Sequence, residues 1–88
     1  MTDKIDKVIL VFGGAGGIGA ETSARLASAG ARVVIADLNA AQAQAKAMGI
    51  VAERGQAIGV ACDITKPASC EAAAQAAVDE YGRLDGVV

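Results

Sequence analysis

A glycine-rich loop, placed between an apolar run and a helical pattern, restricts the fold of this chain more than any other feature. The loop is residues 13–19, Gly-Gly-Ala-Gly-Gly-Ile-Gly, and the apolar run is Val8–Phe12. Because glycine has no Cβ atom, such a loop can turn sharply and a ligand can approach its backbone closely. The helix expected after it directs unpaired N–H groups and the positive end of its dipole to the same place. The arrangement predicts a binding site for a phosphate or pyrophosphate group.

Two glycine triplets in this loop have spacings typical of nucleotide-binding proteins. They are Gly14, Gly16 and Gly19, spaced as G-x-G-x-x-G, and Gly13, Gly17 and Gly19, spaced as G-x-x-x-G-x-G. A triphosphatase loop of the type G-x-x-x-x-G-K-[ST] is excluded, because Ala20 stands where that motif needs lysine. The glycines alone leave the two spacings open.

An acidic residue follows the loop at a sequence spacing that is typical of dinucleotide-binding proteins. The β-branched run Arg32–Ala36 ends at Asp37, close to the roughly 20-residue offset at which dinucleotide-binding proteins place a ribose-binding carboxylate. This second feature favours a nucleotide site over an ordinary glycine turn.

Hydrophobic periodicity and breaker residues predict an α/β fold in which four strands alternate with three helices, βαβαβαβ. The expected strands are residues 7–12, 32–36, 56–62 and a fourth from 84, and the expected helices are residues 17–29, 40–54 and 67–81. The strands are apolar throughout, as in parallel sheets that are buried on both faces.

Capping residues and buried helix faces can also be assigned from the pattern. We expect Asn39 or Asp37 to cap the second helix, with Gly55 ending it, and Asp63 or Thr65 to cap the third. The expected buried faces are Ile18, Thr22 and Leu26 in the first helix, and Cys70, Ala73, Ala77 and Tyr81 in the third.

Composition narrows the function further. The 88 residues allow one small domain, and 53% hydrophobic against 2% aromatic residues predicts a core of small aliphatic side chains. A net charge of −2 without a basic cluster argues against nucleic acid as a partner. The charged N-terminus and the glycine-broken apolar run fit neither a signal peptide nor a membrane span, so we expect no membrane partner and a cytoplasmic protein.

Cysteine and histidine usage excludes several kinds of site. Cys62 and Cys70 form no C-x-x-C pair, and the chain has no histidine. A zinc site and nucleophilic catalysis by a Ser-His or Cys-His pair are therefore excluded, and both cysteines are interpreted as buried or half-buried apolar side chains.

Four segments in register resemble the short-chain dehydrogenases/reductases over essentially the whole chain. They are the glycine loop 13–19, similar to T-G-x-x-x-G-[IL]-G; residues 30–34, similar to the entry of the second strand; Cys62-Asp63-Ile64-Thr65, similar to D-[VI]-T; and residues 81–88, similar to aromatic-G-[RK]-L-D-x-L-V. The resemblance selects Gly13, Gly17 and Gly19 as the relevant glycine spacing. It implies a partial Rossmann-type doubly wound parallel sheet with strand order 3-2-1-4.

The resemblance also implies a cofactor site and an activity. Pyrophosphate would be surrounded by Gly13, Gly16, Gly17, Ile18 and Gly19; the adenosine ribose would be bound by Asp37, followed by Leu38; and the adenine would be bound by Asp63 and Ile64. An acid at Asp37 without a neighbouring cation favours NAD over NADP. The implied reaction is hydride transfer between the nicotinamide and an alcohol or carbonyl substrate.

Two departures from the family pattern matter. Phe12 stands where the family has threonine, which we expect to affect the order of the loop more than the choice of cofactor. The family's Asn-Asn-Ala-Gly, catalytic serine and Tyr-x-x-x-Lys do not occur, and Tyr81 is followed at the fourth position by Asp85. We therefore expect residues 1–88 to be an NAD-binding half-domain, truncated within the fourth strand and inactive alone, with a noncatalytic adenine-nucleotide-binding module as the alternative.

The implied strand order has a consequence for association. The first two helices would cover one face of the sheet and the third helix the other. One helix covers four strands incompletely, so we expect partly bare outer sides of Val8, Leu10, Val33 and Ile35, or of their alternates, and an open edge at Val87 and Val88. Such surfaces recruit further chains, and we expect a homo-oligomer.

Overall fold

Strands and helices alternate along the chain as the periodicity predicts. A computed structural model describes residues 5–13 and 15–88. Its elements are β1 (Val8–Phe12), α1 (Gly17–Ser28), β2 (Arg32–Asp37), α2 (Ala40–Ala52), β3 (Gln56–Ala61), α3 (Pro67–Tyr81) and β4 (Gly86–Val87). Gly14, which belongs to one of the two glycine spacings, lies outside the described residues, so the expectation about loop order stays a prediction.

The sheet is parallel, and its strand order is β3-β2-β1-β4. In β1 and β2, Val8 pairs with Arg32 and Phe12 with Ala36, and on the other side of β1 the short β4 pairs through Ile9 and Gly86. The chain therefore moves outward from β1 to β3 and then returns across the sheet to β4, which confirms the doubly wound Rossmann-type topology.

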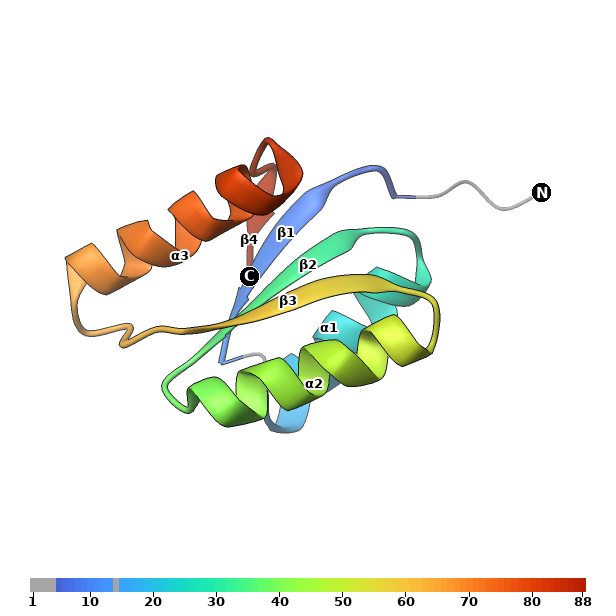
Figure 1. The fold of residues 1–88 in the computed structure, drawn as a ribbon, viewed down its shortest axis with the longest axis horizontal. Coiled ribbons are helices and arrows are strands. Elements are labelled where there is room, and N and C mark those ends of the chain that lie inside the picture. Colours follow the sequence, from blue (N-terminus) through green and yellow to red (C-terminus); the bar gives the residue numbers. More distant parts are fainter. Residues whose placement is uncertain (1–4, 14) are drawn as a thin grey trace.

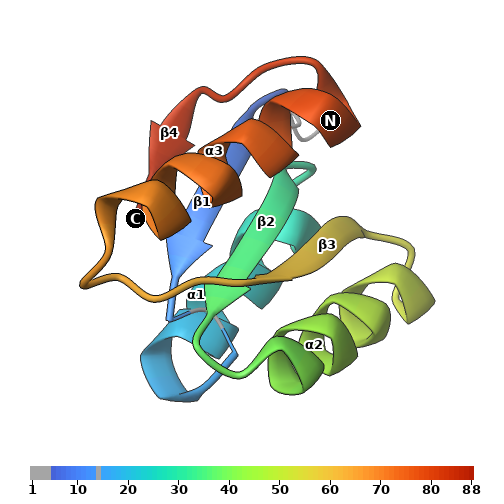
Figure 2. The same ribbon diagram turned by 60° about the vertical axis from the view of Figure 1, so that its left-hand side comes forward.

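Three layers result (Figure 1). Helices α1 and α2 cover one face of the sheet and α3 covers the other, as Figure 2 also shows. Between the sheet and α1 and α2 lies a core that includes Val33, Ile35, Ala43 and Ala47, and between the sheet and α3 lies a second core that includes Leu10. The predicted placement of the helices follows the right-handed crossover of βαβ units.

The expectation of bare central strands is wrong. Val8, Leu10, Val33 and Ile35 are each at most 1% exposed. They belong to β1 and β2, the two inner strands, and the helices cover the sheet at these four positions. The exposed apolar residues lie instead at the edge of the sheet, where Val87 of β4 and the following Val88 are 57% and 63% exposed.

The buried face of α1 also differs from the expected one. Ser23 and Ala27 are buried, Leu26 is half-buried and Ile18 is 85% exposed. Small side chains let α1 lie close to the sheet, and the Ser23 hydroxyl is satisfied by donating to the Gly19 carbonyl at 2.8 Å. In α3 the expected stripe is confirmed, with Ala73 and Ala77 buried.

The helix ends follow the predicted chemistry in part. Asn39 caps α2 by accepting from the Gln42 N–H at 3.1 Å. The expectation that α2 continues to Arg54 is wrong: the helix ends at Ala52, and Arg54 adopts a left-handed φ of 71°. Neither Asp63 nor Thr65 caps α3. Its N-cap is Lys66, because Asp63 and Thr65 bond to each other in the preceding turn.

The amino-terminal edge of the sheet is fixed by a polar network. The Asp85 carboxylate accepts from the Val8 N–H at 2.8 Å and from the Arg83 Nε atom at 2.8 Å. Arg32 pairs with Asp6 at 2.9 Å. The R-L-D segment therefore joins the chain before β4 to the beginning of β1. Among the described helices, none combines the length and apolar character that crossing a membrane requires.

Candidate functional site

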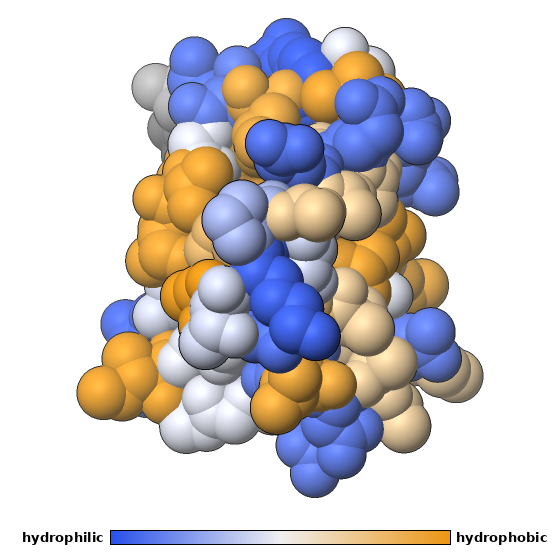
Figure 3. All heavy atoms as spheres, turned by 90° about the vertical axis from the view of Figure 1, so that its left-hand side faces the viewer, coloured by the Kyte–Doolittle hydropathy of each residue, from blue (hydrophilic) through white to orange (hydrophobic). Residues whose placement is uncertain are grey.

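A cleft of about 380 Å³ opens at the carboxyl ends of β1, β2 and β3. In open α/β sheets ligands bind at the carboxyl ends of the strands. The lining residues come from the ends of these strands and the turns that follow: Phe12, Gly13, Ala36, Asp37, Leu38, Cys62, Asp63, Ile64 and Thr65. β3 runs toward the left-hand side of the molecule in Figure 1. Figure 3 shows this side face on, and apolar and strongly hydrophilic side chains alternate on it.

Asp37 joins three parts of this edge. Its carboxylate accepts from the Ala15 N–H in the glycine loop at 3.3 Å and from the Asn39 N–H at 3.1 Å. Its backbone carbonyl accepts from the Cys62 N–H at 2.9 Å, which connects the end of β2 to the end of β3. Each carboxylate oxygen has a second lone pair, so Asp37 keeps the capacity to accept from a ligand hydroxyl.

Asp63 is held by the turn after β3. Its Oδ1 atom accepts from the Thr65 N–H at 3.0 Å and from the Thr65 hydroxyl at 2.6 Å, and its own N–H donates to the Ser69 hydroxyl at 2.8 Å. The Thr65 side chain, followed by the Thr65 backbone, lowers the pKa of Asp63, so the group is ionised at neutral pH. Its Oδ2 atom makes no hydrogen bond within the described part of the chain, and is free to accept.

The backbone conformation explains why some positions of the loop are glycine, but not all of them. Gly13 and Gly17 have φ values of 68° and 54°, which strain residues with a Cβ atom. Gly16 is extended, with φ −134°, and a Cβ atom built there has no neighbour within 4 Å. Neither backbone strain nor packing within the described chain requires glycine at position 16. The open space above it is what a closely approaching ligand needs.

Helix α1 begins at this open space without a side-chain cap. Gly16 is its N-cap, and in the first hydrogen bond of the helix the Ala20 N–H donates to the Gly16 carbonyl at 3.3 Å. The N–H groups of the first turn precede that bond and face outward from the helix end. Since the first turn holds no acidic residue, its positive end is available to an anion.

The structure brings together five of the nine predicted site residues in the cleft: Gly13, Asp37, Leu38, Asp63 and Ile64. The other four, Gly16, Gly17, Ile18 and Gly19, form the adjoining beginning of α1 and do not line it. Residue patterns missed the contributions of Phe12, Ala36, Cys62 and Thr65 to the lining. The one sequence signal that could have identified them is that each is adjacent in the chain to a predicted site residue.

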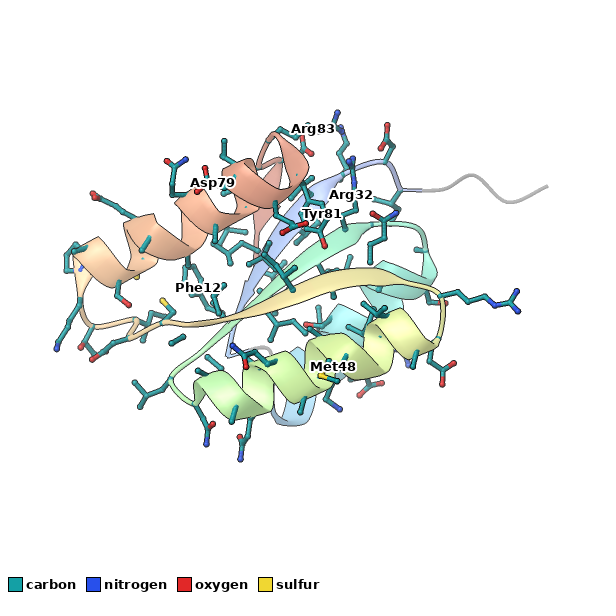
Figure 4. All side chains as sticks on the ribbon, viewed as in Figure 1. Phe12, Arg32, Met48, Asp79, Tyr81 and Arg83 are labelled. Atoms are coloured by element: carbon teal, nitrogen blue, oxygen red, sulfur yellow. The ribbon has the colours of Figure 1, made fainter. Side chains whose placement is uncertain are left out.

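The thiols of the two cysteines and the Tyr81 hydroxyl are given no role in the candidate site, although Cys62 lines the cleft and the Cys70 thiol donates to the Ile64 carbonyl at 3.7 Å. Cys62 is buried and Cys70 half-buried, both as free thiols, which confirms their interpretation. Burial, and then the neighbouring Cys62, raises the pKa of Cys70, so the thiol stays protonated. Tyr81 lies at the opposite end of α3, with the Arg32 guanidinium 5.9 Å from its ring centroid (Figure 4).

A larger groove, of about 500 Å³, lies between α1 and α2. Its charged lining residues, Lys46, Glu53 and Arg54, have mixed signs, and no predicted site residue lines it. We therefore place the candidate site at the smaller cleft, where glycine loop and carboxylates meet.

Comparison with known proteins decides the family. The family model described as short chain dehydrogenase matches residues 7–88. The chain belongs to the short-chain dehydrogenase family. A solved structure of a dehydrogenase has the same fold. The crystal structure of a hydroxysteroid dehydrogenase from Escherichia coli superposes on this chain with a TM-score of 0.91 at 35% identity, over 96% of this chain and 35% of that one.

Two curated short-chain dehydrogenase relatives are similar in sequence. D-threitol dehydrogenase of Mycolicibacterium smegmatis and 4-formylbenzenesulfonate dehydrogenase of Comamonas testosteroni are each 46% identical over 82 residues, which cover 93% of this chain and 32% of theirs. The chain thus spans about a third of the length of the curated relatives it matches. Both relatives are named as dehydrogenases, but for different substrates.

Proposed function

We propose that this chain is the dinucleotide-binding part of an NAD-dependent oxidoreductase of the short-chain dehydrogenase family. The convergence of Asp37, Asp63 and the glycine loop on one edge of the sheet carries the proposal. When bound, the nicotinamide supplies the hydride that is exchanged with an alcohol or carbonyl carbon. The residues of this chain bind and orient the cofactor.

The two parts of the site suit different parts of a dinucleotide. The beginning of α1 offers unpaired N–H groups and open space at Gly16, which suits the pyrophosphate. The cleft offers two carboxylates, which suit the ribose hydroxyls at Asp37 and the adenine amino group at Asp63. Ile18, Leu38 and Ile64 are large apolar side chains that are 85%, 75% and 67% exposed at this edge, and a bound cofactor would cover part of that surface.

The charges at the cleft favour NAD over NADP. Asp37 stands at the position that holds the ribose in this fold, and no Lys or Arg is among the described residues that line the cleft. A 2′-phosphate would approach a carboxylate without a compensating cation.

Proton transfer requires groups that these residues do not assemble. In the sequence, Asp85 stands four positions after Tyr81, so the chain holds no Tyr-x-x-x-Lys. Tyr81 also lies away from the cleft, and burial, more than the neighbouring Glu80, raises its pKa. We propose that the substrate pocket and the proton-transfer residues of the working enzyme belong to chain beyond these 88 residues, in a protein of the length of its relatives.

Binding of NAD to the 88-residue chain tests the cofactor assignment. Isothermal titration and amide spectra would be recorded for the parent, for Gly16→Glu and for Gly49→Glu. Position 16 is extended with open space, so glutamate there preserves the fold but places a negative charge at the pyrophosphate site. Gly49 on α2 also has open space around it and serves as the charge-matched control.

The parent and Gly49→Glu are expected to bind NAD, and Gly16→Glu is expected to bind at least tenfold more weakly. Equal binding by Gly16→Glu, or no binding by a folded parent, contradicts the cofactor assignment. We further expect no formation of reduced NAD by the chain alone with any alcohol. Turnover above the level of Gly16→Glu would contradict the proposed placement of the proton-transfer residues.

A further inference from the structure

The cleft has a chemistry that excludes phosphate and accepts a neutral group with hydrogen-bond donors. Asp37 and Asp63 are its two charged lining residues, and both are acids. An anionic group is repelled here, whereas amino and hydroxyl groups find acceptors. Between the acids the lining is apolar, from Phe12, Leu38 and Ile64. A flat heteroaromatic base with an exocyclic amino group fits this combination, which extends the proposed function and rests on it.

Phe12 is the aromatic residue of this lining, and it lies between the cleft and the core beneath α3. It is the last residue of β1, and it has the same strand parity as Val8 and Leu10, whose side chains belong to the core beneath α3. Its half-buried ring packs against that core and also lines the cleft. Figure 4 shows Phe12 on the α3 side of the sheet, where the strands converge.

A ring in this position is held before any ligand arrives. One side of Phe12 packs on the core, and the backbone is fixed because its N–H donates to the Val88 carbonyl at 3.1 Å. Leu38 and Ile64, in contrast, project from turns and are mostly exposed. The cleft therefore has one preorganised aromatic wall, and base faces stack favourably on aromatic rings.

We infer that Phe12 is a further binding residue of the nucleotide site, whose ring contacts the adenine base. The contact adds binding free energy to the adenine half of the cofactor and fixes the base between the ring and the carboxylate of Asp63. Phe12 takes no part in proton or hydride transfer.

The test uses NAD itself as the probe, with the parent chain, Phe12→Leu and Tyr81→Leu. Leucine keeps an apolar side chain but removes the ring. Tyr81 is the other aromatic residue of the chain, packs against the same core and lies at the far end of α3, so it is the matched control. Dissociation constants come from calorimetry, and proton spectra follow the adenine H2 and H8 signals of NAD during titration.

The parent and Tyr81→Leu are expected to shift the adenine signals upfield, because the protons lie over an aromatic ring. Phe12→Leu is expected to lose this shift and to bind NAD about fivefold more weakly or worse, at the lower end of what loss of a base–aromatic contact produces. Retained amide dispersion verifies that each variant is folded, and the parent's upfield shift tests the contact even without a folded variant.

The outcomes separate the two proposals. NAD binding by the parent without an upfield adenine shift, or with unchanged affinity in folded Phe12→Leu, overturns the role of Phe12 and leaves the cofactor assignment intact. Failure of NAD to bind the folded parent overturns the proposed function and the role of Phe12 with it.

Discussion

The carboxylate of Asp37 and the backbone N–H of Ala15 meet at 3.3 Å, although 22 positions separate them in the sequence. The residue assigned to the ribose therefore also holds the loop assigned to the pyrophosphate. Substitutions at Asp37 are therefore expected to change the proposed ligand contact and the position of the loop together.

We expect the cofactor preference to depend on this carboxylate. We expect a preference for NAD over NADP of at least tenfold, about 1.4 kcal/mol in binding free energy. Asp37→Ala should reduce the preference, because the repulsion of a 2′-phosphate disappears. Asp79→Ala removes a charge from α3 away from the cleft and should leave the preference unchanged (Figure 4). Calorimetric titration with both cofactors measures the ratio, and a parent that binds NADP as well as NAD would contradict the assignment.

Two glycines on neighbouring elements should respond oppositely to alanine. A Cβ atom at Gly59 in β3 would lie 2.4 Å from the Ala43 carbonyl oxygen of α2, so Gly59→Ala forces the helix from the sheet and should lower the free energy of unfolding by about 1–3 kcal/mol. Gly49→Ala meets no neighbour within 4 Å and improves helix propensity, so it should raise that energy by about 0.5–1 kcal/mol. Urea unfolding measures both. Equal effects would show that the close packing of α2 on β3 is wrong.

Stability at acid pH should depend on Asp85. The hydrogen bond from the Val8 N–H, and then the Arg83 side chain, lower the pKa of Asp85 from its usual 3.8. Because the folded-state pKa is the lower one, the stabilisation is complete above the unfolded-state pKa and is lost as pH falls through the folded-state pKa. Asp85→Asn should therefore show a smaller loss of stability than the parent between about pH 5 and pH 2.

Thermal unfolding across this pH range measures the dependence on Asp85. Asp79→Asn is the control, since Asp79 accepts from Gln75 of the same helix on the exposed side of α3 and does not contact the edge of the sheet that Asp85 holds. Parallel pH profiles for the parent and Asp85→Asn would refute the role of the Val8 contact.

Association should proceed through the edge strand. Val87 in β4 is 57% exposed, and β4 pairs with one neighbour, β1. Open apolar edges template pairing with other chains, and lysine on an edge opposes it. Val87→Lys should reduce concentration-dependent association, whereas Val51→Lys should not, since Val51 is a similarly exposed valine on α2. Sedimentation velocity over a concentration series distinguishes the two, and a parent that is monomeric throughout would contradict the expected oligomer.

Much of the fold was predictable because local signals agree with one another. The apolar run before the glycine loop, Asn39 before α2 and Gly82 after α3 each mark an element boundary, and the structure has boundaries at these places. The strand order came from the family resemblance, since pairing between distant strands leaves no mark in local periodicity.

The errors have a common physical origin in close packing. In α1 the most hydrophobic candidate, Ile18, is exposed, whereas Ser23 is buried because a small side chain and a bond to the Gly19 carbonyl suit close contact with the sheet. Hydrophobic periodicity ranks residues by hydrophobicity alone and carries no information about how closely the helix approaches the sheet. The cleft shows the same limit, because the sequence presents Phe12 only as a departure from a motif, while the fold makes it a wall beside two acids.

The bond between Asp85 and Val8 spans 77 positions, and it has a consequence for the timing of synthesis. Among the four strands described, β1 is translated first, yet one of its two neighbours and the partner of its first N–H group come from the last few residues of these 88. While a ribosome is still making α3, β1 can pair with β2 alone, and its other edge stays open. Contacts of such long range form late and slow folding. Of the four strands described, the earliest one made is thus an inner strand that gains its second neighbour only when the last few of these residues have been made, so one edge of β1 stays open until then.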